Sequence, residues 1–168
     1  LEHNERLEFL GDAVLELVVT NFLFSKFPNE AEGELTSYRS ALVNTQSLST
    51  AATYLGINDF LLLSKGEAKD IGRARSIILA DTLEALIGAL YIDQGYDNAK
   101  SFIEKHLFTQ IDIEYIIKHK LWMDAKSRFQ EQAQEHTGIT PSYKTLKEEG
   151  PDHNKHFTLG VFLGEKQI

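Results

Sequence analysis

The stretch of sequence that decides the fold runs from residue 77 to residue 90 and reads Ile77-Ile78-Leu79-Ala80-Asp81-Thr82-Leu83-Glu84-Ala85-Leu86-Ile87-Gly88-Ala89-Leu90. As a helix, this stretch is apolar almost all round its axis, and such a helix is normally buried. Asp81 and Glu84 then face one way from an otherwise apolar helix. A buried carboxylate needs a cation, a proton or an arginine, because leaving it unpartnered costs on the order of several kcal/mol.

A second group of acids lies near the start of the chain, on a helix that we expect from Asn4 to Phe27-Pro28. Its acids fall on one narrow stripe and are Glu5, Glu8, Asp12 and Glu16. Like charges at this spacing destabilise a helix unless something positive compensates them. Arg6 lies off the stripe, so the helix itself offers no partner. We interpret Glu16 as a surface residue.

Packed together, these two helices would combine four carboxylates into one site, with Gly11 and Gly88 permitting close approach of the backbones. Hard oxygen ligands without cysteine or clustered histidine favour magnesium, with manganese as a substitute, over zinc. Magnesium held by carboxylates usually serves phosphate chemistry. The expected metal ligands and catalytic residues are Glu8, Asp12, Asp81 and Glu84. The alternative is that these acids pair with arginines, namely Arg39, Arg73 or Arg75.

The periodicity of apolar residues divides the chain into two domains. Residues 1–120 read as helices throughout, and we expect the apolar helix to run from about Ser76 to Gln94 and to end at Gly95. Residues 121–168 begin with a helix over 124–136 and continue with alternating strands around 141–146 and 157–163, separated by the turn Gly150-Pro151-Asp152. The predicted fold class is an all-α domain followed by a partial α+β domain.

The composition bounds the function further. The chain has 168 residues, no cysteine and a formal charge of −8. Without cysteine, disulfides and thiol catalysis are excluded. No run of 18 or more apolar residues and no signal-peptide pattern occur, so we expect a cytoplasmic protein with no membrane partner. The acidic charge does not exclude nucleic acid, because exposed charges are screened within about 10 Å.

The motifs resemble those of bacterial ribonuclease III. The residues 3–15, His3-Asn4-Glu5-Arg6-Leu7-Glu8-Phe9-Leu10-Gly11-Asp12-Ala13-Val14-Leu15, look like the signature of that family, and residues 76–89 resemble its second acidic motif. The resemblance implies a ribonuclease III-like helical nuclease domain that cuts double-stranded RNA with magnesium in rRNA and mRNA processing. The products would carry 5′-phosphate and 3′-hydroxyl ends.

The same resemblance implies roles for further residues. Acids with supporting roles near the RNA or in dimerisation would be Glu5, Glu32 and Glu67. Phe9 sits at the edge of the acidic stripe, where the family buries it against the partner subunit of a homodimer, and the alternative is a contact within its own chain. Residues 124–131 and the turn at 150–153 are similar to the start of a double-stranded-RNA-binding domain, which reads duplexes by shape and 2′-hydroxyl. Its RNA contacts would be Gln130, Glu131 and His153.

Two departures from the family pattern are expected at the ends. The helix that precedes the family signature is missing before Leu1, and the third strand and lysine-rich helix of the RNA-binding domain are missing after Ile168. Phosphate contacts supply much of the affinity for duplexes, so this exact chain is expected to bind RNA weakly. Two other functions stay open: a non-catalytic RNA-binding scaffold, disfavoured because all four acids are retained, and an all-helical nucleotide pyrophosphatase, which would not explain the RNA-binding half-domain.

Overall fold

The computed structural model describes residues 3–109, 113–119, 123, 125–151 and 155–168. The chain forms two compact units, Leu1–Trp122 and Met123–Ile168. The first unit is helical and the second combines one helix with a small sheet. The predicted fold class, a helical domain followed by an α+β domain, is confirmed.

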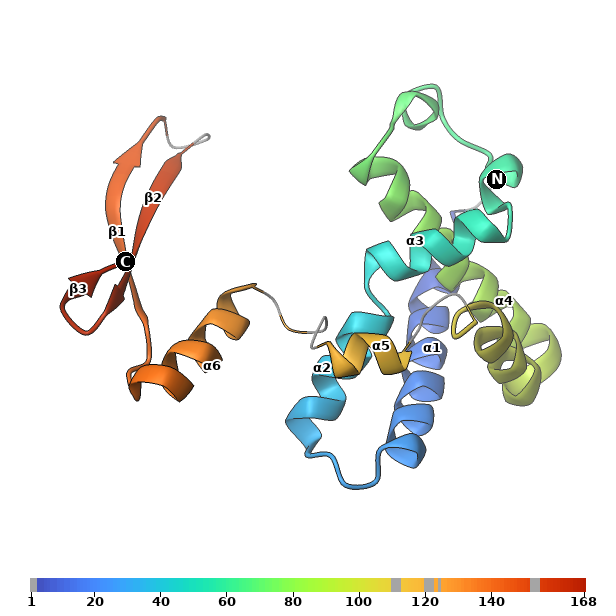
Figure 1. The fold of residues 1–168 in the computed structure, drawn as a ribbon. Coiled ribbons are helices and arrows are strands. Elements are labelled where there is room, and N and C mark those ends of the chain that lie inside the picture. The colour runs from blue at the N-terminus through green and yellow to red at the C-terminus, as the bar shows by residue number, and fades with distance from the viewer. Residues whose placement is uncertain (1–2, 110–112, 120–122, 124, 152–154) are drawn as a thin grey trace. The chain divides into compact units, whose positions relative to one another are not determined.

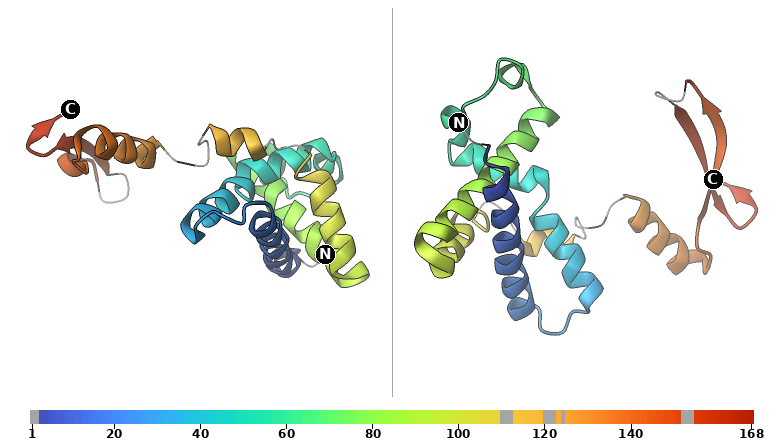
Figure 2. Two further views of the ribbon diagram at one scale, coloured as in Figure 1. Left: turned by 60° about the horizontal axis from the view of Figure 1, so that its bottom comes forward. Right: turned by 180° about the vertical axis from the view of Figure 1, so that it is seen from behind.

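Two long helices form the centre of the first unit. Helices α1 (Glu5–Lys26) and α4 (Arg73–His106) lie side by side, as Figures 1 and 2 show. Apolar side chains of α1 form one side of the core and are completely or almost completely buried, namely Val14, Leu15, Val18, Val19 and Leu23. Buried side chains of α4 join them in the core, namely Leu79, Leu83 and Ile87. The apolar stretch that begins at residue 77 is therefore a core helix, as the sequence predicts.

The two helices touch through glycines. A Cβ atom on Gly11 would overlap the backbone carbonyl oxygen of Glu84, and one on Gly88 would overlap the carbonyl oxygen of Leu7. Both glycines are buried within regular helix. Their role is therefore to let two backbones come closer than any side chain would permit, as the sequence predicts for this pair.

Shorter helices complete the first unit. They are α2 (Glu32–Leu42), α3 (Thr45–Tyr54), the 3₁₀ turns η1 (Ile57–Phe60) and η2 (Glu67–Lys69), and α5 (Ile113–Lys118). Helix α3 begins at Asn44, whose side-chain oxygen accepts a hydrogen bond from the Ser47 backbone N–H at 2.9 Å, a typical N-cap. Lys26 at the end of α1 forms a 3.0 Å ion pair with Glu114, which ties α5 to α1.

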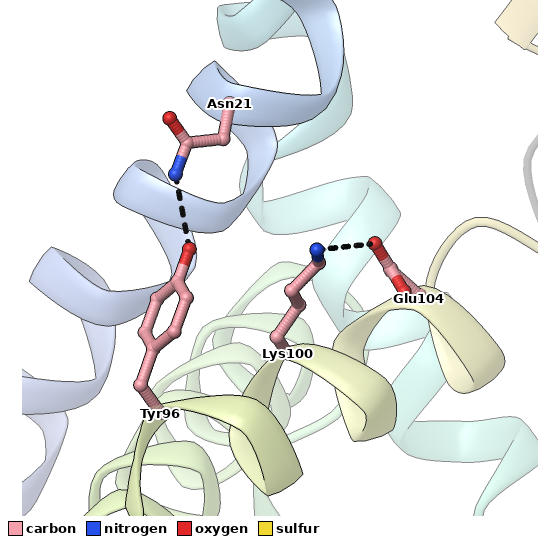
Figure 3. A network of polar contacts seen from close by, with 4 residues as sticks. All are labelled: Asn21, Tyr96, Lys100 and Glu104. Atoms are coloured by element: carbon pink, nitrogen blue, oxygen red, sulfur yellow. Dashed lines mark hydrogen bonds and ion pairs between the residues drawn. The ribbon is translucent and has the colours of Figure 1, made fainter. Parts of the chain in front are cut away.

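Helix α4 differs from the prediction at its start, whereas its regular backbone is interrupted at Gly95 as predicted. It begins at Arg73, three residues before the predicted start at Ser76, and Gly95, with the non-helical angles φ 80° and ψ −178°, kinks it into two helical halves. Beyond the kink, the Tyr96 hydroxyl accepts a 3.0 Å hydrogen bond from the Asn21 amide of α1, and Lys100 lies 3.8 Å from Glu104 (Figure 3). Helix α4 therefore changes direction at Gly95, and only glycine adopts this backbone without strain.

The second unit contains α6 (Ala125–Thr137), β1 (Ser142–Glu149), β2 (His156–Leu163) and β3 (Lys166–Gln167). The sheet is antiparallel in the order β1-β2-β3, with a register shift between Thr145 and Lys147. Helix α6 meets the sheet where the Lys126 ammonium lies 4.8 Å from the centre of the Tyr143 ring. The structure adds the short strand β3 to the two predicted strands, because Gly164, at φ 61°, turns the chain back within two residues.

Within the described part of the chain, none of the helices combines the length and the apolar character that crossing a membrane requires.

The close approach of α1 and α4 predicts a large asymmetry between glycine substitutions. Gly88→Ala forces a methyl group against the Leu7 carbonyl and should lower the free energy of unfolding by about 3 kcal/mol. Gly33→Ala is the control: Gly33 lies in α2 with open space around it, so this change should raise the free energy of unfolding by up to about 1 kcal/mol. Urea denaturation of both variants measures the difference, and equal stabilities would contradict this account of the packing.

Candidate active site

Three carboxylates from the two central helices meet in one place. Oxygen atoms of Glu8 on α1 and of Asp81 and Glu84 on α4 all lie within 4.8 Å of one another. All three residues are half-buried. Asp81 and Glu84 share a helix face because they are three residues apart, and the glycine contact between the helices brings Glu8 opposite them. The structure thus joins acids that are more than seventy residues apart in the sequence.

Burial raises the pKa of all three carboxylates, and neighbouring acids add to the rise at Glu84 and Glu8. Burial raises the pKa of Glu84 to about 7, and the charges of Asp12, Asp81 and Glu8 add to the rise. Burial also raises the pKa of Asp81. For Glu8, burial is again the largest cause, followed by the charges of Asp81, Glu5 and Asp12. The site is therefore short of positive charge, and its acids hold protons more tightly than free carboxylates do.

Arginine does not supply that charge. No ion pair recorded between described residues involves Glu8, Asp81 or Glu84. The Arg39 guanidinium donates to the Thr20 hydroxyl at 3.1 Å, and Arg75 donates to backbone carbonyls. The alternative in which these arginines neutralise the acids is therefore not supported. A set of hard oxygen donors without a protein cation fits a divalent ion such as magnesium or manganese.

Asp12 stands slightly apart from the other three acids. Asp12 is exposed, and it is not among the three acids whose carboxylate oxygens lie within 4.8 Å of one another. Its charge nevertheless acts on the site, since it raises the pKa of both Glu84 and Glu8. Asp12 lies one helical turn after Glu8 on the same stripe of α1. It thus faces the site without joining its inner group.

The supporting acids lie in three different surroundings. Glu5 is exposed beside Glu8 and contributes to the raised pKa of that residue. Glu32, at the start of α2, accepts a 3.0 Å hydrogen bond from the Thr36 hydroxyl and lines a cavity of about 470 Å³ between α1 and α2. Glu67 lies in η2, where hydrogen bonds from Ser64 lower its pKa. None of the three joins the inner group of carboxylates.

The turn around Glu67 has a signal in the sequence, because Ser64 and Glu67 bond to each other's backbone. The Ser64 backbone N–H donates to the Glu67 carboxylate at 2.9 Å, and the Glu67 N–H donates to the Ser64 hydroxyl at 3.3 Å. This reciprocal pair has the hydrogen bonds of a capping box, although Gly66 rather than Ser64 directly precedes η2, and the pattern Ser-x-x-Glu at 64–67 could have predicted it.

Phe9 is 81% exposed on the surface of the first unit. The alternative in which it contacts its own chain's core is therefore wrong. The reason is its place on α1: the helix turns its other face, with Val14, Leu15 and Val18, to the core.

Two of the expected RNA contacts of the second unit lie on α6. Gln130 and Glu131 line an open depression on α6 together with Gln134, Glu135 and Thr140. His153 lies outside the described residues.

Comparison with known proteins gives the same division of the chain. Residues 1–111 match the family described as Ribonuclease-III-like, and residues 125–168 match the double-stranded RNA binding motif. Ribonuclease 3 of Geobacillus kaustophilus is 48% identical over 167 residues, which cover 99% of this chain and 67% of the relative. Ribonuclease 3 of Campylobacter jejuni is 45% identical over 170 residues, with 99% and 73% covered.

Solved structures agree with this. The nuclease domain of ribonuclease III from Campylobacter jejuni superposes with a TM-score of 0.61 at 44% identity, covering 66% of this chain and 75% of that one. Dicer from Pichia stipitis superposes with a TM-score of 0.56 at 29% identity. The match covers 98% of this chain and 76% of the Dicer chain.

Fold, acidic site and RNA-binding unit together define an endonuclease that acts on double-stranded RNA. The chain belongs to the ribonuclease III family. The similarity to Ribonuclease 3 enzymes over nearly the whole chain disfavours both the nucleotide pyrophosphatase and the non-catalytic scaffold as alternatives.

The raised pKa of Glu84 predicts how stability depends on pH in metal-free protein. Its pKa is about 7 in the folded state against an ordinary 4.5, so the folded state binds more protons than the unfolded state between these values. The contribution of Glu84 to the free energy of unfolding therefore falls as pH rises through this window. Glu84→Gln should be more stable than the parent protein at pH 8 by about 1–2 kcal/mol, after allowance for solvent screening, and by much less at pH 5.

Urea denaturation with a chelator at both pH values measures this difference. Glu16→Gln is the control, because Glu16 is an exposed acid on α1 and outside the inner group of carboxylates. A gain in Glu84→Gln that is the same at pH 5 and pH 8 would show that burial of a charge is not its cause.

Proposed function

We propose that the chain hydrolyses the phosphodiester bonds of double-stranded RNA with magnesium, or with manganese as a substitute, held by Glu8, Asp12, Asp81 and Glu84. The observation that carries this proposal is the inner group of three carboxylates, whose oxygens lie within 4.8 Å of one another without an arginine partner. Asp12 would complete the site, since its charge reaches both Glu84 and Glu8.

The residues of the site would each have a distinct task. When bound, magnesium would polarise the phosphoryl group, activate water and steady the leaving oxygen. Glu8 and Asp81 offer carboxylate oxygens from opposite helices, which fixes the width of the site through the α1–α4 packing. Glu84, with a pKa of about 7, exchanges its proton near neutral pH, so loading the site with a divalent cation would release that proton.

The finer features of the activity are proposed on the resemblance to ribonuclease III. Cleavage would leave 5′-phosphate and 3′-hydroxyl ends, and the natural role would be rRNA and mRNA processing in the cytoplasm. We also propose that residues 1–120 act as the nuclease domain and residues 121–168 as the RNA-binding domain. In the latter, Gln130, Glu131 and His153 would contact ribose hydroxyls and the minor groove, where A-form duplexes are read.

We further propose that the chain works as a homodimer through an apolar stripe on α1. Phe9, Leu17 and Phe24 are 81%, 51% and 71% exposed, and their spacing places them on one side of the helix. Large apolar side chains gathered on one exposed helix face favour a protein partner. A structure of the nuclease domain from Campylobacter jejuni, 48% identical with a TM-score of 0.58, is described as showing flexibility in a region involved in dimer formation.

The metal proposal predicts the loss of cleavage in two conservative variants. Asp81→Asn and Glu84→Gln should each slow the cutting of long duplex RNA in magnesium by more than about a hundredfold. Mutating a residue that only hydrogen-bonds to a metal ligand already lowers activity by about 10–100-fold, and loss of a ligand should lower it further. Calcium in place of magnesium should support RNA binding with little cutting. Asp93→Asn, an exposed acid on the same helix α4, is the matched control and should cut at the parent rate. Full activity in both site variants would refute the metal site.

The dimer proposal predicts a change in mass. Phe9→Ala should weaken self-association at least about thirtyfold, because a buried aromatic anchor is commonly worth 2 kcal/mol or more at an interface. Sedimentation velocity at several protein concentrations measures this. Phe60→Ala is the control, since Phe60 is 83% exposed but lies in η1 rather than on α1. A parent protein that sediments as a monomer at all concentrations would overturn the proposal.

A further inference from the structure

The segment from residue 65 to residue 75 carries a net positive charge, whereas the rest of the first unit is acidic. It contains the bases Lys65, Lys69, Arg73 and Arg75 and only two acids, Glu67 and Asp70. The rest of residues 1–123 holds 16 acids and 7 bases. A duplex RNA that approaches the first unit therefore meets local positive charge here, since phosphate attraction falls off within about 10 Å at ordinary salt.

The side chain of Arg75 holds this segment in shape. Its Nη2 donates to the backbone carbonyl of Glu67 at 2.9 Å and to that of Ala68 at 3.4 Å, and its Nε donates to the Asp70 carbonyl at 3.2 Å. Arg75 lies in the first turn of α4 and is half-buried. One guanidinium thus fastens three carbonyls of the η2 turn to the helix that carries Asp81 and Glu84. A lysine could not do this, because its ammonium is a single point rather than a planar fork of donors.

One acid of the turn, Glu67, forms its hydrogen bonds within the turn. The Glu67 carboxylate accepts the Ser64 backbone N–H at 2.9 Å, which closes the turn from the other side. The turn also lies near the start of α1, because the charge of His3 is among the causes that lower the pKa of Glu67, after its hydrogen bonds with Ser64. His3 lies two residues before the start of α1, which carries Glu8, and Arg75 lies six residues before Asp81 on α4. The turn therefore borders the part of the unit that holds the acidic site.

The lysines of the turn lie on the surface of the first unit. Lys65 and Lys69 are exposed, and no ion pair recorded within the described residues includes either of them. Arg75 fixes the backbone on which they stand. A lysine on a fixed backbone loses less freedom on meeting a phosphate than one on a mobile loop, so less of the binding free energy is spent on ordering.

We propose that Arg75 is a positioning residue for the substrate, which holds the 64–70 turn so that Lys65 and Lys69 meet phosphates of the duplex RNA beside the acidic site. The proposal rests on the proposed function. Arg75 would touch neither the RNA nor the metal. Its contribution would appear in the affinity for RNA, whereas the chemical step would depend on the carboxylates.

Kinetics on long duplex RNA with Arg75→Ala and Arg75→Lys in the full chain test this proposal. Both variants should raise KM by roughly five- to thirtyfold, because the side chains must then be ordered on binding, and kcat should stay within about twofold of the parent value. Ser64→Ala, which keeps every charge, should raise KM in the same direction by less. Hydrogen exchange without RNA should show faster exchange at residues 65–70 in all three variants.

Several results would overturn the proposal. If Arg75→Lys restores the parent KM, charge rather than the guanidinium fork is what matters. If kcat falls with KM unchanged, or if Lys65→Ala with Lys69→Ala leaves KM unchanged, the turn does not position RNA. A parent protein that cuts no duplex RNA would count against the proposed function instead, and the hydrogen-exchange comparison would still decide whether Arg75 holds the turn.

Discussion

The direct contact between the backbones of α1 and α4 is the constraint on which the rest of the structure depends. Gly11 faces the Glu84 carbonyl and Gly88 faces the Leu7 carbonyl, with no room for a Cβ atom on either. This contact sets the distance between the helices, and Glu8 therefore comes opposite Asp81 and Glu84. A wider crossing would pack an ordinary apolar core but would leave the carboxylates too far apart to share an ion.

The same contact makes the metal-free site unfavourable. Three half-buried carboxylates without an arginine repel one another, and the pKa of Glu84 rises to about 7 as a result of burial and of its acidic neighbours. The apolar core around Leu15, Val18 and Ile87 offsets that repulsion and holds the helices in place. The repulsion between the carboxylates thus lowers the stability of the metal-free protein, and a bound divalent cation would relieve it. Such unfavourable charge clusters are common at functional sites.

The molecule separates its chemical tasks among different parts. The acids of the proposed metal site lie on the central helices, the basic residues 65–75 lie at and before the start of α4, and the RNA-binding motif forms a unit of its own. The overall charge of −8 hides this separation, because acids and bases are segregated within the first unit. Family membership and the acidic site agree with one another although they rest on independent observations, sequence similarity in one case and side-chain geometry in the other.

The sequence by itself determined the helical class of the first unit, the core role of residues 77–90 and the identity of the acids, because apolar periodicity and unpaired charges are local properties. It also predicted the glycine contact, since Gly11 and Gly88 have no side chain to keep the two backbones apart. Only the tertiary structure decided that Glu8, Asp81 and Glu84 form the inner group while Asp12 stands outside it, that Phe9 faces solvent, and that Arg75 fastens the η2 turn. These outcomes depend on the rotation and spacing of packed helices and on contacts between residues, which no local pattern encodes.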